Sequence, residues 1–182
     1  MTGLLLVCYA GIQQNYRQSL NDPQIQMAED AAAALNSGVP LNQIVPIGSV
    51  ARVNIAQSLA PWIAVYDTAG TPLASEGVLD GSPAQPPASV FTNLWDGEAE
   101  GFAKETRFSW QPEPGVRQAL VIVRFNPKEG LRGFVVAGRN MREVEDRIAK
   151  LGSMFFLGWM LLMAATVFAK ILEFYFSRNQ RI

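Results

Sequence analysis

The feature that most constrains the fold is an uncharged apolar run near the C-terminus, residues 151–169. Only Gly152, Ser153, Gly158 and Thr166 interrupt its apolar character. As a helix these residues extend about 28 Å, which is close to the hydrocarbon thickness of a bilayer. A single span must be helical, because lipid offers no hydrogen-bond partners to the backbone. The sequence therefore predicts one transmembrane helix here.

The residues around this run predict where the helix begins and where the bilayer interfaces lie. Lys150 and Lys170 bracket the run, and three consecutive aromatic residues, 174–176, follow it as interfacial anchors. Upstream, Asn140 has the character of an N-cap and Glu143 stands at capping-box spacing from it. We therefore expect a juxtamembrane and transmembrane helix over residues 141–176, followed by a cytoplasmic tail, residues 177–182.

The charged first part of this helix carries an apolar seam. Its members recur at spacings of 3, 4, 3 and 4, the a/d pattern of paired helices. They are Met141, Val144, Ile148, Leu151 and Phe155. The seam predicts helix pairing, either with the N-terminal helix or with a second copy of the chain. The alternative is that it packs on its own domain.

The N-terminus is also apolar, but it is short. Residues 1–12 would form a helix of only about 18 Å, less than a full span. We interpret residues 1–20 as a short or truncated N-terminal membrane helix. A signal-peptide core is the competing interpretation, although the positive n-region and a small-residue cleavage site are lacking.

Composition restricts the chemistry of the remaining domain, residues 21–140. The chain has no histidine, the commonest general base and metal ligand, and it has a single cysteine, Cys8, so no intrachain disulfide can form. Residues 21–150 hold 15 acidic and 11 basic side chains, which argues against nucleic-acid binding. Motifs for phosphate loops, nucleophile elbows or metal sites are lacking. We expect a non-enzymatic protein without a cofactor or a metal.

Periodicity and turn residues predict an α+β domain. Expected helices cover residues 24–36 and 88–95, a helical turn covers 53–59, and residues 77–87 form a loop. The expected strands are 62–66, 72–75, 105–111, 116–125 and 131–139. Two strands, a crossover and a three-strand meander make a five-stranded antiparallel sheet with a long N-terminal helix. Residues 116–125 are the most apolar strand and are expected at its centre.

Three segments carry a resemblance to a known family: 62–70 (WIAVYDTAG), 118–125 and 133–140. Together they resemble the PAS-like domains (PDC or Cache type) found outside the membrane in bacterial sensor proteins. In that family a membrane-derived N-terminal helix lies along the domain, and the last strand leads into the second transmembrane helix. The resemblance covers most of residues 20–150. The sequence departs from sensor kinases and chemoreceptors, because it ends at Ile182 without a cytoplasmic transmitter.

The resemblance implies a small-ligand pocket between the sheet and the crossover helices. Aromatic side chains supply contact area there, and arginines bind a carboxylate or phosphate at two points. The candidate residues are Trp62, Tyr66, Trp110, Arg117 and Arg139. The alternative is that the aromatic residues belong to the core and the arginines to the outer face of the sheet.

Topology and partners follow from the flanks of the span. The tail holds Arg178 and Arg181 without an acid, which places it in the cytoplasm and the domain in the periplasm or outside. The expected location is a bacterial inner membrane, and the expected partners are the lipid bilayer and another membrane protein or a second copy. The predicted function is a sensory or interaction module that relays to a membrane partner through its C-terminal helix. The alternative is an accessory structural subunit of a larger membrane complex.

Overall fold

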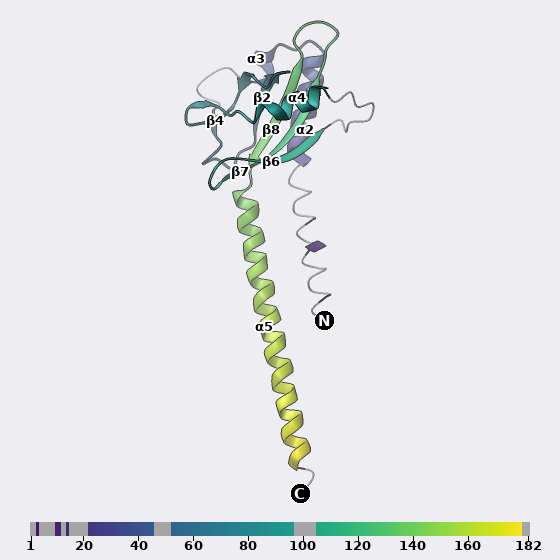
Figure 1. Ribbon diagram of the computed structural model, residues 1–182, viewed down its shortest axis with the longest axis vertical. Helices are drawn as coiled ribbons and strands as arrows, with labels where there is room; N and C mark the ends of the chain where they lie inside the picture. The colour runs from purple at the N-terminus through teal and green to yellow at the C-terminus, as the bar shows by residue number, and fades with distance from the viewer. Residues whose placement is uncertain are drawn as a thin grey trace. The chain divides into compact units, whose positions relative to one another are not determined.

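The computed structural model describes residues 22–45, 52–96 and 105–179, together with the single positions 3, 10, 11 and 14. The prediction for residues 1–20 therefore lies almost wholly outside the described residues, as does the end of the tail. The chain divides into two units (Figure 1). One comprises residues 17–143, and the other comprises residues 1–16 with residues 144–182.

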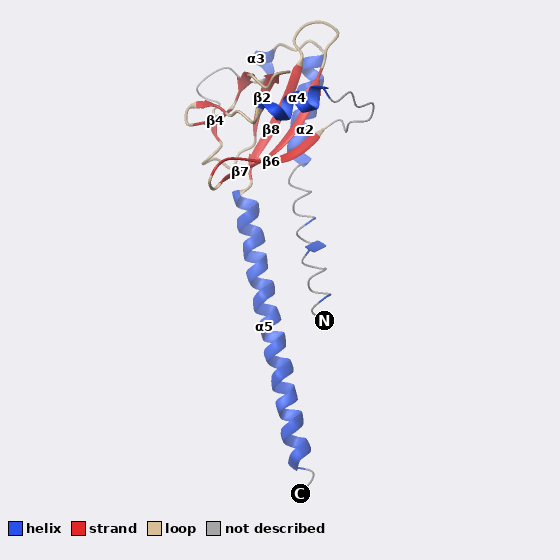
Figure 2. Cartoon of the chain, viewed as in Figure 1, coloured by secondary structure: helices blue, strands red, loops and turns tan. Residues whose placement is uncertain are grey.

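The domain is built on a five-stranded antiparallel sheet with the order β3-β2-β8-β7-β6 (red in Figure 2). The strands are β2 (Trp62–Asp67), β3 (Pro72–Ser75), β6 (Thr106–Glu113), β7 (Val116–Phe125) and β8 (Gly133–Asn140). The predicted α+β class and the antiparallel sheet are confirmed. The prediction of the central strand is wrong. β8 takes the centre, between β2 and β7, and every residue of it except Arg139 is buried.

One face of the sheet is covered by helix α2 (Asp22–Asn36), which contacts β7 and β8. Ala28, Ala32 and Leu35 are buried there against valines of β7 and β8, and the small alanines let the helix lie close to the strands. At the end of the helix the Asn36 side chain accepts a hydrogen bond from the backbone N–H of Asn126, at 2.8 Å. A short helix, α3 (Leu41–Ile44), follows.

The opposite face is covered by helix α4 (Ala88–Asp96) and by a second, smaller sheet with the order β1-β4-β5. Its strands are β1 (Val53–Asn54), β4 (Gly77–Leu79) and β5 (Ser82–Pro83). The expected helical turn at 53–59 and the expected loop at 77–87 are therefore wrong in part. Strands of two or three residues are too short to show alternation, and β1 pairs with β4 in parallel across a long stretch of sequence.

The hairpin between β2 and β3 turns on Asp67. Its carboxylate accepts backbone hydrogen bonds from Ala69, at 2.9 Å, and from Thr71, at 2.7 Å. Gly70 occupies the left-handed region, with φ of 85°, which a glycine adopts without steric cost. Partial burial acts to raise the pKa of Asp67, but hydrogen bonds from Thr71, Ala69 and Gly70 outweigh it and hold this pKa below its usual value.

Asp67→Asn is expected to remove a pH-dependent part of the stability. A carboxyl whose pKa is lowered by folding stabilises the protein above the unfolded-state pKa, and this contribution disappears as pH falls through the folded-state pKa. Asparagine keeps the acceptor oxygen but cannot ionise. The wild type should exceed the variant by less than about 1 kcal/mol at pH 7, and the difference should disappear as pH falls below the usual aspartate range and through the lowered folded-state pKa. Urea unfolding at several pH values measures it, and a pH-independent difference would contradict the assignment.

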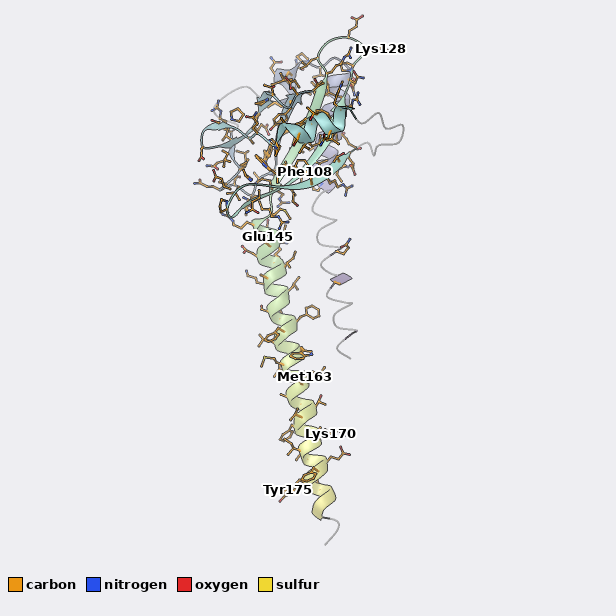
Figure 3. The ribbon with its side chains drawn as sticks, in the orientation of Figure 1. Phe108, Lys128, Glu145, Met163, Lys170 and Tyr175 are labelled. Carbon is orange, nitrogen blue, oxygen red and sulfur yellow. The ribbon has the colours of Figure 1, made fainter. Side chains whose placement is uncertain are left out.

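The C-terminal helix, α5 (Arg142–Asn179), is continuous, and residues Arg142–Phe176 are long and apolar enough to cross a membrane, because an 18-residue stretch within them has a mean hydropathy of 2.0. The predicted apolar helix is confirmed, and it extends three residues beyond the predicted boundary at Phe176. Met163, Lys170 and Tyr175 project outward from it (Figure 3). Lys170 and Glu173 form an ion pair at 2.7 Å.

Candidate functional site

The five predicted ligand residues do not lie together. Successive side chains of a strand point to opposite faces of the sheet. Trp62 and Tyr66 are completely buried on the face that α4 covers, and Trp110 is half-buried beside them. Arg117 and Arg139 belong to the opposite set of positions, on the face that carries α2. A single pocket made of all five is therefore not present in this arrangement.

Aromatic side chains fill the region in which the resemblance places a ligand. Phe91 of α4 stacks on Tyr66 with ring centroids 4.9 Å apart, and it also contacts Phe134 at 5.6 Å. The Tyr66 hydroxyl donates a hydrogen bond to the carbonyl oxygen of Ala84. Burial raises the pKa of Tyr66 well above its usual range, so the hydroxyl stays neutral and remains a donor. These contacts make the region a packed core.

The C-terminal end of α4 (Ala88–Asp96) is held against this core by Trp95. Trp95 meets Phe134 edge-on at 5.9 Å, and the Arg124 guanidinium lies 3.9 Å from the centroid of the Trp95 ring. A cation over an indole face contributes about 0.5–1 kcal/mol at an exposed site. Helix α4 is therefore attached to the sheet by aromatic contacts along its length.

Two glycines make room for the Trp62 indole. A Cβ atom at Gly77 would lie 2.6 Å from ring atoms of Trp62, and a Cβ at Gly138 would clash with the same ring. The indole N–H donates to the side-chain oxygen of Gln118 at 3.2 Å. Glycine at these two positions is thus required by close packing.

Gly138→Ala is expected to destabilise the domain by at least about 1 kcal/mol, because overpacking of a filled core forces side chains or backbone to move. Urea unfolding of the full chain in mild detergent measures this loss. Gly158→Ala is the matched control, since a Cβ at Gly158 meets nothing within 4 Å. Equal stability of the two variants would contradict the close packing at Gly138.

A buried polar cluster lies where β8 leads into α5. The carbonyl oxygen of Ile55 accepts two side-chain amide hydrogen bonds, from Gln118 at 2.8 Å and from Asn140 at 2.9 Å. The side chains of Ile55, Gln118 and Asn140 are at most 3 % exposed. Both lone pairs of the Ile55 carbonyl oxygen therefore accept hydrogen bonds in a region shielded from water. A buried polar group without a hydrogen bond lowers the stability of the fold, so both bonds matter. We call these three residues the Ile55 clamp.

The clamp also fixes the start of α5. The Asn140 side-chain oxygen accepts the backbone N–H of Arg142 at 2.9 Å, which confirms the predicted N-cap. The Arg142 guanidinium donates to the carbonyl oxygen of Gln57 at 3.1 Å, and Glu143 pairs with Arg139 at 3.2 Å. One short segment, residues 55–57, thus contacts β7, the end of β8 and the first turn of α5.

Sequence reasoning found only Asn140 of this cluster. Gln118 was visible as an amide within the most apolar strand, and a buried amide needs partners. Ile55 and Gln57 contribute backbone carbonyls, so their side chains carry no signal of the role. The two residues do lie in a hydrogen-bonded turn, as expected, in which the backbone N–H groups of Gln57 and Ser58 both donate to the carbonyl oxygen of Asn54.

The predicted pairing seam lies on the covered side of α5. Val144 is buried, and Ile148, Leu151 and Phe155 are half-buried, whereas Leu157 is 60 % exposed. Met141 is half-buried as well, and the Ser109 hydroxyl lies 3.7 Å from its sulfur. Helix pairing through this seam, and the partner it would involve, stay predictions.

A separate groove of about 630 Å³ lies at the end of α2. Apolar side chains, including Leu35, Phe125 and Leu131, line it together with Lys128 and Glu129. Lys128 projects from the turn between β7 and β8 (Figure 3). None of the five predicted ligand residues lines this groove.

Comparisons of the chain with protein-family models, with curated proteins and with solved structures give no match. Within the part of the chain that the structure describes, no three cysteine, aspartate or glutamate side chains gather in a way that could hold a metal ion. The geometry of the domain and of α5 therefore carries the functional proposal.

Proposed function

We propose that this chain is a membrane-anchored interaction module with a PAS-like extracytoplasmic domain, which relays the state of that domain to a membrane partner through α5. The observation that carries the proposal is the Ile55 clamp. It joins the small sheet, the large sheet and the cap of α5 through buried hydrogen bonds.

The order of the elements supports the PAS-like part of the proposal. A hairpin (β2–β3), a crossover that contains α4, and a meander (β6–β7–β8) form one sheet in which the first strand neighbours the last. Helix α2 lies along one face, and β8 leads directly into the apolar helix. These are the features on which the resemblance rests.

The hydrogen bonds of the clamp supply the relay. Asn140 uses its amide nitrogen on Ile55 and its oxygen on Arg142. Because Arg142 also bonds to Gln57, a displacement of residues 55–57 must break hydrogen bonds at the first turn of α5. Such a change of the cap is worth about 1–2 kcal/mol, enough to shift a two-state equilibrium about fivefold to thirtyfold.

Co-purification in mild detergent tests the relay. The tagged full chain should retain a stoichiometric membrane protein. Gln118→Met, which keeps the volume and removes both hydrogen bonds of the amide, should reduce the retained partner while the chain stays in the membrane. Lys128→Ala, on an exposed turn, is the control and should leave the partner unchanged. A chain that purifies alone would overturn the proposal.

A second candidate function is an accessory structural subunit of a larger membrane complex. It is favoured by the aromatic filling of the region around Tyr66 and Phe91, which leaves packing contacts where a sensor would hold a ligand. The same co-purification separates the two functions. Partner retention that does not respond to Gln118→Met would favour the structural subunit over the relay.

Membrane insertion and orientation give a further expected result. The full chain should remain in the pellet after alkaline carbonate extraction, because α5 offers a span of bilayer length. Trypsin added to intact spheroplasts should cleave within the domain, since Lys128 lies on an exposed turn. Protection of the domain until the membrane is broken would place it in the cytoplasm and contradict the proposed orientation.

A further inference from the structure

Strand β6 forms one edge of the large sheet (Figure 2). Within the described part of the chain it pairs with β7 alone, and its eight residues exceed the length of an average strand. The opposite edge is protected, because β3 has only four residues, begins at Pro72 and contacts β5. A long edge strand can pair with another chain unless it is shortened or covered. β6 is therefore the edge at which this sheet can accept a further strand.

The hydrogen bonds of the sheet show which backbone groups of β6 are used on β7. The carbonyl oxygen of Arg117 accepts the N–H of Met141 at 2.8 Å, so the backbone groups of Arg117 face β8. Those of the next residue, Gln118, face β6, because successive residues of a strand direct their hydrogen bonds to alternate sides. Gln118 lies opposite Trp110. The N–H and C=O groups of Trp110 are therefore directed at β7.

The alternate positions of β6 are directed the other way. The backbone groups of Arg107 and Ser109 point away from β7 and have no hydrogen-bond partner among the described residues. The register shift of β6 comes only after Trp110, so the strand is regular at these two positions. Their two N–H and two C=O groups are complementary to the backbone of an extended segment. The hydrogen-bonding pattern of the edge thus specifies a β-strand as its occupant.

The side chains of β6 specify the pattern of that strand. Phe108 and Trp110 are half-buried, at the margin of the core that α4 covers. Arg107 and Ser109 are exposed on the opposite face of the sheet. In an added strand, every second side chain would lie beside the two aromatic residues, where an apolar side chain stabilises the pair. The complementary segment therefore alternates between apolar and polar residues.

This edge is connected to the start of α5. Trp110 lies opposite Gln118, and Gln118 lies opposite Asn140. Gln118 and Asn140 donate to the carbonyl oxygen of the Ile55 clamp, and Asn140 also caps α5. A strand added to β6 would therefore extend the row of residues that includes the clamp and the cap.

We propose that β6 is the docking edge for the membrane partner, which adds an extended extracytoplasmic segment to Arg107–Trp110 as a further strand. The inference rests on the proposed function, which supplies the partner. The added strand exchanges backbone hydrogen bonds with Arg107 and Ser109 and covers Phe108 and Trp110. Docking then orders the strand next to Gln118, and through Gln118 it acts on the Ile55 clamp.

Residue-resolved amide hydrogen exchange tests this edge. The full chain is measured in native membranes and, after purification, in vesicles of phosphatidylethanolamine and phosphatidylglycerol. Ser109→Pro removes the outward N–H without touching the hydrogen bonds to β7, and proline is tolerated in an edge strand at such a position. Ser109→Ala is the matched control, because it also removes the hydroxyl but keeps the N–H. The N–H groups of Phe108 and Trp110 report whether β6 and β7 remain paired.

The N–H groups of Arg107 and Ser109 are expected to exchange at least about tenfold more slowly in native membranes than in the vesicles. Ser109→Ala should keep this slowing, and Ser109→Pro should lose it at Arg107 while Phe108 and Trp110 stay protected. If the proline variant loses protection at Phe108 and Trp110 as well, the wild-type comparison alone decides.

Three results would overturn the docking edge. Equal and fast exchange in both preparations would mean that nothing is added to β6. Equal and slow exchange would mean that another part of the chain covers it. Slowing that increases with the density of the chain in the vesicles would mean that a second copy pairs there. A partner that co-purifies although exchange is equal would overturn this edge alone, whereas a chain that purifies alone would overturn the proposed function too.

Discussion

Trp62→Ala is expected to lower the free energy of unfolding by about 3–5 kcal/mol, the usual cost of truncating a fully buried tryptophan. Trp62 has no exposed surface, and its ring fills the space left by Gly77 and Gly138. The variant also leaves the side-chain oxygen of Gln118 without the indole donor. Since a domain of this size has a total stability of about 5–15 kcal/mol, much of it would be lost.

This variant separates a core role of Trp62 from a ligand-binding role. A tryptophan that lines an open pocket would lose binding on truncation and keep most of the stability. Urea unfolding of the full chain in mild detergent, followed by near-ultraviolet circular dichroism, measures the difference through the remaining aromatic residues. Trp110→Ala, at a half-buried position on the same face, is the control and should cost clearly less.

A loss of less than about 1 kcal/mol in the free energy of unfolding of Trp62→Ala would contradict the packed core, and it would favour a ligand-binding role for Trp62. Trp62→Phe adds a second measurement. It keeps most of the ring volume and removes the hydrogen bond to Gln118, so its cost should lie well below that of alanine.

The parts of the fold that sequence patterns predicted are those with long periodic segments. Helix α2 and strand β7 have enough residues to show which side is apolar, and the predicted bounds of β7 are those observed. The small sheet was missed because β1, β4 and β5 have two or three residues each. Their pairing depends on tertiary contacts, and no local pattern records those contacts.

In the candidate site, too, the roles set by neighbouring residues were predictable, and the roles set by tertiary contacts were not. Asn140 was predictable as a cap because the capping role depends on residues that follow within one turn. Its second role, on the Ile55 carbonyl, joins residues 85 positions apart through a backbone atom, and backbone atoms are the same in every sequence. The five predicted ligand residues were grouped by chemistry alone. The alternation of the strands places the arginines on one face and the aromatic residues on the other.

Asn140→Ala is expected to cost about 2–3 kcal/mol, because one side chain serves two buried hydrogen bonds. Loss of an N-cap costs about 1 kcal/mol. Loss of the buried hydrogen bond to the Ile55 carbonyl oxygen, which then keeps only the bond from Gln118, costs a similar amount or more. Both effects act at the point where β8 leads into α5.

Asn140→Ser separates these two contributions. Serine is a good N-cap, so it retains the acceptor for the Arg142 N–H, but its short side chain cannot reach the Ile55 carbonyl. The difference between the serine and alanine variants then reports the cap, and the difference between wild type and serine reports the clamp. Each should be about 1 kcal/mol in urea unfolding.

A double-mutant cycle with Gln118→Met decides whether the clamp acts as a unit. Gln118 and Asn140 donate to the same oxygen, so residues 55–57 should be displaced when both donors are absent. The two substitutions should therefore be non-additive, with a coupling of at least about 0.5 kcal/mol. Additive costs would mean that the hydrogen bonds of Gln118 and Asn140 stabilise the domain independently of each other. The start of α5 would then have no energetic connection to the strands behind it, and the proposed relay would lose its physical basis.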